Sequence, residues 1–231
     1  MKNRVYKSLI TLFYLLSFLI LVFCIKVRFS DTLNMYTSVR LVLLMIVCIF
    51  IYINSFIMIK KLNISKKVAH INLTIIFIVY ITTIFMLTLF DSRFGRQGLI
   101  FAKWDSNLLK SYMDTSFNMV PFKTINLFIN GYLKGIVSFK NFSINIFGNF
   151  VAFMPCGILV PALFKKINKY YKFLIIMIMF VSLIELLQFL TLSGSCDIDD
   201  LILNIIGSSI IYFIYKIKFI NRIVNKILFI E

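Results

Sequence analysis

The chain contains 231 residues, of which 61% are hydrophobic, and its mean hydropathy is +0.95. A soluble domain is nearer half apolar, so this composition excludes an ordinary soluble protein. The formal net charge is +16, but the basic residues stand in short clusters beside apolar segments, as in membrane proteins, and we expect no nucleic-acid partner.

Six apolar segments follow one another along the chain, and each is close to the roughly 17–25 residues that a helix needs to cross a bilayer. The single carboxylate within them is Glu185. The sequence therefore predicts an all-α fold, a polytopic transmembrane helical bundle with about six spans, surrounded by membrane lipids. The segments cover residues 8–25, 41–59, 68–90, 143–164, 173–192 and 201–217.

A long segment separates the third span from the fourth. Within it, residues 124–139 are apolar for much of their length, but they are too short to span and are interrupted by Gly131, Lys134 and Gly135. We expect an interfacial or re-entrant helix there. The predicted domains are an N-terminal transmembrane helix pair (1–67), a membrane domain (68–217) and a basic cytoplasmic tail (218–231).

The distribution of basic residues predicts the orientation of the spans. If the N-terminus is cytoplasmic, the four segments on that side carry fifteen Lys and Arg residues, whereas the two short segments on the other side carry three. Long loops have little weight in this comparison. We therefore expect a multi-pass protein of the plasma membrane with both termini in the cytoplasm, and the acidic stretch "SGSCDIDDLILN" (193–204) faces outward.

Polar side chains lie on one face of each of the last three predicted spans. With both termini in the cytoplasm, these side chains are near the extracellular end of each span. Polar groups inside a membrane are costly, so they mark buried faces and functional sites. Together with an arginine at the exit of the third span, which would neutralise part of the charge, they form a candidate outward-facing site. The candidate ligand-binding residues are Asn149, Glu185, Gln188, Asp197, Asp200, Asn204 and Arg93.

Structural roles are the alternative for several of these residues. Asp199 or Asp200 could be the N-cap of the sixth helix, and Asp199, which points away from the polar stripe, is the better candidate for a cap. Small residues such as Gly148, Gly157 and Gly207 favour close helix packing. Pro155 predicts a kink in the fourth span, a structural feature rather than a ligand contact.

Five short motifs in order resemble the VanZ-like family of bacterial membrane proteins, over roughly residues 70 to 217. The family is named for a protein that confers low-level resistance to the glycopeptide teicoplanin in Gram-positive bacteria, and this implies a role in the cell envelope and in antibiotic resistance. The family pattern has an Arg before the acidic cluster where this chain has "SGSC", so either Arg93 or Arg96 replaces it or the ligand of this chain differs. The motifs are "LTLFDSR", "NMVPFKTI", "NxxxFxPxG", "ExxQ" and "DIDDLILNxxG".

Two functions remain open at this point. The first is a non-enzymatic protein acting at the outer leaflet, where lipoglycopeptides insert. The second is a membrane-embedded enzyme acting on a lipid-linked envelope precursor, with Glu185 and Asp200 as catalytic acid and base. No cofactor is predicted, although a divalent metal held by Asp197 and Asp200 would suit the enzyme. We favour the non-enzymatic function.

The predicted topology can be tested by thiol labelling of intact cells. On a cysteine-free background, Ser195→Cys should react with a membrane-impermeant reagent added from outside, because the acidic stretch faces outward. Asn168→Cys should stay unlabelled until the membrane is permeabilised. The reverse labelling pattern would show that the orientation is inverted.

Overall fold

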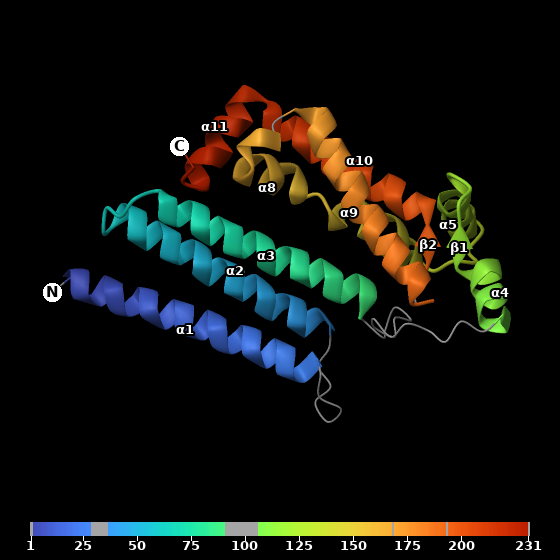
Figure 1. Cartoon of the computed structure of the whole chain (residues 1–231), viewed down its shortest axis with the longest axis horizontal. Helices are drawn as coiled ribbons and strands as arrows, with labels where there is room; N and C mark the ends of the chain where they lie inside the picture. Colours follow the sequence, from blue (N-terminus) through green and yellow to red (C-terminus); the bar gives the residue numbers. More distant parts are fainter. Residues whose placement is uncertain (1, 29–36, 91–105, 168, 193, 231) are drawn as a thin grey trace. The chain divides into compact units, whose positions relative to one another are not determined.

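The computed structural model describes residues 2–28, 37–90, 106–167, 169–192 and 194–230, and most of these residues are helical (Figure 1). Six helical segments of 19–26 residues are long and apolar enough to cross a membrane, which confirms the predicted all-α polytopic fold. They are Lys2–Val27, Thr37–Lys60, Lys67–Leu89, Phe139–Leu163, Tyr170–Leu190 and Ile198–Lys216.

The first three spans are single helices, and the last two are as well. These helices are α1 (Lys2–Arg28), α2 (Thr37–Lys60), α3 (Lys67–Leu89), α9 (Tyr170–Leu190) and α10 (Ile198–Lys216). The described residues pack as two compact units: Met1–Thr83 with Arg222–Glu231, and Ile84–Asn221.

In the first unit, a buried amide joins the three N-terminal helices. Asn72 on α3 is 2% exposed. Its Oδ1 accepts a hydrogen bond of 2.8 Å from the Tyr14 hydroxyl on α1, and its Nδ2 donates one of 2.9 Å to Ser55 Oγ on α2. Because no water competes for these groups inside a membrane, such side-chain bonds hold spanning helices together.

The fourth span is broken into short pieces, as Pro155 predicts. It consists of α6 (Phe139–Ser143), a π-helical turn (Ile144–Gly148), α7 (Asn149–Ala152) and α8 (Cys156–Leu163), followed by a 3₁₀ turn (Lys165–Ile167). The helix stops at Phe153, whose ψ of 4° leaves the helical range. A prolyl nitrogen cannot donate to the preceding turn, so the helix restarts after Pro155.

The pieces of the fourth span pack closely against α10, and glycines make this possible. A Cβ on Gly207 would lie 1.8 Å from the backbone oxygen of Phe150, and one on Gly157 would lie 2.5 Å from that of Ser208. These contacts confirm the packing role predicted for both glycines. The same prediction fails for Gly148, because a Cβ there would meet no atom of the described residues within 4 Å.

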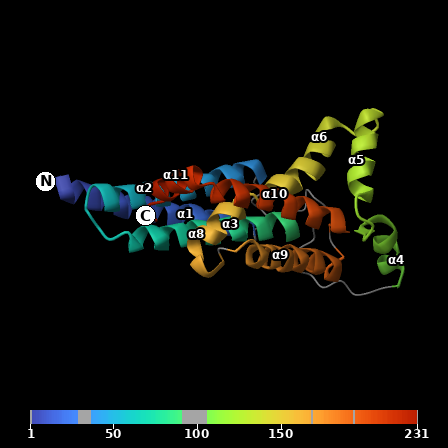
Figure 2. The same ribbon diagram turned by 90° about the horizontal axis from the view of Figure 1, so that it is seen from above.

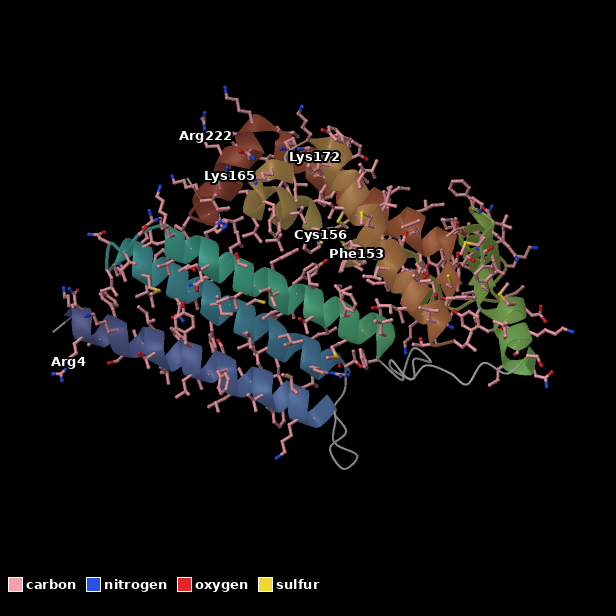
Figure 3. The ribbon with its side chains drawn as sticks, in the orientation of Figure 1. Arg4, Phe153, Cys156, Lys165, Lys172 and Arg222 are labelled. Carbon is pink, nitrogen blue, oxygen red and sulfur yellow. The ribbon has the colours of Figure 1, made fainter. Side chains whose placement is uncertain are left out.

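Aromatic rings fill the interior of the second unit. Phe153, 1% exposed, meets Phe180 edge to face with their ring centroids 5.6 Å apart. Phe173, fully buried, stacks on Tyr212 at 4.7 Å. Figure 3 labels Phe153 beside Cys156, which is also buried. Offset and edge-to-face rings of this kind stabilise a core beyond their buried area alone.

The long segment after α3 contains helices that do not span. They are α4 (Ser106–Thr115), which the sequence analysis missed, and α5 (Lys123–Leu133), which confirms the predicted interfacial or re-entrant helix. None of the residues of α5 is buried, and Leu133 and Ile136 are 74% and 78% exposed. Figures 1 and 2 show α4 and α5 at the end of the second unit where α9 meets α10.

Candidate functional site

Two short strands bring the loop before α5 against the acidic stretch before α10. Strand β1 (Phe117–Asn118) pairs in parallel with β2 (Cys196–Asp197), with Asn118 opposite Asp197. The Cys196 N–H donates a 2.9 Å hydrogen bond to the backbone oxygen of Ser116. The pairing places two of the sequence motifs, "NMVPFKTI" and "DIDDLILN", side by side.

The carboxylate of Asp199 caps the N-terminus of α5. Asp199 is 1% exposed. Its Oδ2 accepts hydrogen bonds from the backbone N–H groups of Thr124 (2.8 Å) and Ile125 (3.1 Å), and its Oδ1 accepts one from Phe122. The free N–H groups and the dipole at a helix N-terminus favour a negative charge there. Asp199 therefore has a capping role, but for α5 rather than for its own helix.

The N-cap of α10 is Asp197, so the alternative that Asp199 or Asp200 caps this helix was wrong. Asp197 has the extended backbone of an N-cap residue, with φ −134° and ψ 122°, and its Oδ1 accepts from the Asp199 N–H at 2.9 Å. The same oxygen accepts from Asn118 Nδ2, also at 2.9 Å. Asp199 and Asp200 are already inside the helix, where a side chain cannot act as the N-cap.

Glu185 and Asp200 connect neighbouring helices in the same region. Glu185 Oε2, on α9, accepts a 2.9 Å hydrogen bond from the backbone N–H of Asp197. Asp200, on α10, accepts from Nδ2 of Asn149 on α7. Glu185, Asp200 and Asn149 are each partly exposed. The polar faces predicted for the last three spans thus meet at one end of the second unit.

Two further candidates are buried, and each has an amide oxygen without a partner among the described residues. Gln188 is 2% exposed, and its Nε2 donates a 2.8 Å bond to the backbone oxygen of Thr88 at the end of α3. Asn204 is 4% exposed and donates at 2.7 Å to the backbone oxygen of Asp200. Their Oε1 and Oδ1 atoms accept nothing in the described part of the chain.

Sequence analysis did not assign Asn118 to this cluster. Its amide Nδ2 also donates to Thr124 Oγ1 at 3.1 Å, so it ties the loop before α5 to Asp197. The signal was present in "NMVPFKTI", where an Asn three residues before a Pro marks a turn leading into a helix. What the motif could not reveal was its partner, 79 residues further along the chain.

A charge partner for the cluster was expected, and a metal held by Asp197 and Asp200 was an open alternative for the enzyme. The ranges that the structure describes contain no group of three or more His, Cys, Asp or Glu residues that could hold a metal ion. Of the two candidate ligands, Asp197 already accepts two N–H groups on Oδ1. Arg93 and Arg96 lie outside the described residues.

Cys196 lies among the carboxylates, in the turn between α9 and α10. It is 4% exposed and forms no disulfide. Burial, together with the negative charges of Glu185, Asp197 and Asp200, raises the pKa of the Cys196 thiol to about 11. A thiolate would add a further negative charge to a poorly solvated group, so the neutral thiol is the stable form at physiological pH.

The fold and the cluster together define a class: multi-pass membrane proteins whose last three spans meet in an acidic cluster that also holds a short, non-spanning helix. Within this class, residues 77–220 match the family model described as VanZ/LLP1. The match covers more than half of the chain, which therefore belongs to this family. No curated protein and no solved structure matches the chain significantly.

Replacing Asp199 should release the N-terminus of α5. Asp199→Asn keeps the size of the side chain but removes its charge and turns an amide donor toward backbone N–H groups. We expect a loss of about 2 kcal/mol or more in the local stability of α5, and hydrogen exchange of residues 122–133 roughly 30-fold faster. Asp114→Asn, the same change on the exposed face of α4, is the control. Unchanged exchange in Asp199→Asn would contradict the capping role.

The Cys196 thiol should report the charge of the cluster. With the other three cysteines replaced, its alkylation by a small reagent should be slow at pH 8 and accelerate up to about pH 11, because only the thiolate reacts. Glu185→Gln removes a negative charge that raises the thiol pKa, so the rate at pH 9 should increase. Asp114→Asn should leave the rate unchanged. Reaction at pH 8 as fast as that of a free cysteine would contradict this prediction.

Proposed function

We propose that this VanZ-like protein acts at the outer face of the plasma membrane, where Glu185 and Asp200 bind a lipid-linked envelope component or an inserting lipoglycopeptide. By doing so it lowers the susceptibility of the cell to glycopeptides such as teicoplanin, without catalysing a reaction. The orientation rests on the distribution of Lys and Arg, which favours cytoplasmic termini and an outward-facing turn between α9 and α10.

The division of roles among the four carboxylates is the observation that carries the proposal. Asp199 is almost completely buried, and Asp197 is 6% exposed. Both cap helices, so their charges serve the fold. Glu185 and Asp200 are partly exposed and cap neither α5 nor α10. Carboxylates at membrane depth are costly and mark functional sites by default, which makes this pair the best candidate for contact with a ligand.

The surroundings of the pair suit a ligand with a lipid anchor. Helix α5 and the turn after it present apolar side chains to the outside, among them Leu127, Leu133 and Ile136, which are 59%, 74% and 78% exposed. Asp199 fixes α5 beside the acidic cluster. A head group that bound Glu185 or Asp200 would therefore have apolar surface within the same unit for its chain.

An enzyme acting on a lipid-linked precursor is the second candidate. It is favoured by the position of Glu185, whose Oε2 accepts from the backbone of Asp197, three residues before Asp200. Two carboxylates from neighbouring helices thus reach the same turn, as an acid and base would need to. A change in the pool of a lipid-linked precursor that depends on Asp200 and on a divalent metal would favour this candidate.

The proposal predicts that both carboxylates are needed for resistance. In cells that lack the protein, the wild-type gene should raise the minimum inhibitory concentration of teicoplanin. Glu185→Gln and Asp200→Asn should each return it to the level of the empty vector, because they remove charge and keep size and hydrogen-bonding capacity. The double variant should be no worse than either single one, since residues that act as a unit are not additive.

The control for these variants is Asp114→Asn, which should resist as the wild type does. Immunoblots of membrane fractions must show similar amounts of the wild type and the four variants. If both single variants keep full resistance at normal abundance, Glu185 and Asp200 are structural and the proposal is wrong. If the wild-type protein has no effect on susceptibility in a sensitive host, the proposed role in resistance is wrong.

A further inference from the structure

The last helix, α11 (Lys218–Ile227), carries a repeated pair of residues that the functions above do not use. Each pair is a basic residue followed directly by an apolar one, and the pairs recur every four residues. At 100° per residue this spacing forms two parallel strips along the helix, one basic and one apolar. The pairs are Lys218 and Phe219, Arg222 and Ile223, and Lys226 and Ile227.

Both strips lie on the exposed side of α11. All six side chains are exposed, and the apolar ones strongly so: Phe219 is 71%, Ile223 41% and Ile227 50% exposed. The residues on the other side of the helix are less exposed: Ile220, Asn221 and Val224 are partly buried, and Asn225 is buried. The protein therefore covers one side of the helix and leaves uncovered the side that carries three positive charges beside three large apolar groups.

The two ends of α11 are attached to membrane-spanning helices. Its first residue follows α10 after the single residue Ile217. Beyond its last residue, the Phe229 ring packs on Tyr52 and Phe56 of α2 with centroid distances of 6.0 and 6.3 Å. The Tyr52 hydroxyl donates a 3.3 Å hydrogen bond to the backbone oxygen of Ile227. Helix α11 is thus held close to where spanning helices leave the bilayer.

We propose that α11 lies in the membrane interface, with its apolar strip in the acyl region and its basic strip bound to the phosphates of anionic phospholipids. The basic side chains occupy one sector of the helix and the apolar ones the adjacent sector, which matches a planar boundary between charged head groups and hydrocarbon. A protein groove would instead receive a broad apolar stripe with residues at both three- and four-residue spacings. A helix of ten residues is marginal in water, so the surface also stabilises it.

Hydrogen exchange of the full-length protein in vesicles tests this binding. Each Lys or Arg beside an anionic surface strengthens association about fivefold. Amides of residues 218–227 should therefore exchange more slowly, by up to roughly 100-fold, in phosphatidylcholine mixed with phosphatidylglycerol than in phosphatidylcholine alone. K218Q/R222Q/K226Q should abolish the difference. Inorganic phosphate added to phosphatidylcholine vesicles should give no protection, because it offers no hydrocarbon for the apolar strip.

The matched control is K61Q/K66Q/K67Q, which removes the same charge from exposed positions between α2 and α3 and at the first residue of α3. This variant should keep the effect of phosphatidylglycerol on α11. Equal exchange of the wild-type helix in the two kinds of vesicle would overturn the proposal. Protection by free phosphate would overturn it as well, because protection would then not require a lipid surface. Loss of protection in the control variant would also overturn it, because protection would then not depend on the basic strip of α11 in particular.

Discussion

The carboxylate of Asp199 is the group on which the arrangement of the second unit depends. It accepts backbone N–H groups from Phe122, Thr124 and Ile125, up to 77 residues earlier in the chain. Phe122 is in the left-handed region with φ 65°, which costs a non-glycine residue roughly 1–2 kcal/mol. That conformation aims its N–H at Asp199, and the charged cap offsets the strain. None of the residues of α5 is buried, so the cap adds to a small set of surface contacts, among them the Asn118–Thr124 hydrogen bond and the stacking of Tyr132 on Phe142.

Around Asp199, some of the remaining acidic and amide side chains are buried in the fold and others are partly exposed. Asp197 starts α10 and receives the amide of Asn118, so the β1–β2 pairing and the helix cap support each other. Asn149 reaches Asp200 from the broken fourth span. The partly exposed Glu185 and Asp200 are therefore supported by the buried Asp197 and Asp199. A binding group keeps its geometry best when its support is already rigid.

The sequence was informative where structure depends on local pattern. Apolar length alone predicts the spans. The effects of Pro155, Gly157 and Gly207 follow from the proline ring, which lacks an N–H, and from the missing side chain of glycine, and these do not depend on which residues lie nearby. Helical spacing also placed Asn149, Glu185 and Asp200 at one level, because each stripe is a property of its own helix. Which aspartate caps which helix could not be predicted in this way. The assignment of each aspartate to a helix depends on the register of β1 against β2, two segments 79 residues apart. No local sequence pattern predicts this register. The Tyr14–Asn72–Ser55 contacts were missed for the same reason.

The dependence of earlier segments on later ones has a consequence for synthesis at the ribosome. Helix α5 is complete more than 60 residues before its cap appears, and Phe150 in the fourth span precedes Gly207, against which it packs, by more than 50 residues. At a translation rate of about 5–20 residues per second, these parts wait several seconds for their partners. Meanwhile the free N–H groups of α5 and the broken backbone after Ala152 are exposed to lipid or to the insertion machinery. The second unit is therefore completed from its C-terminal end, when α10 arrives and closes contacts with both at once.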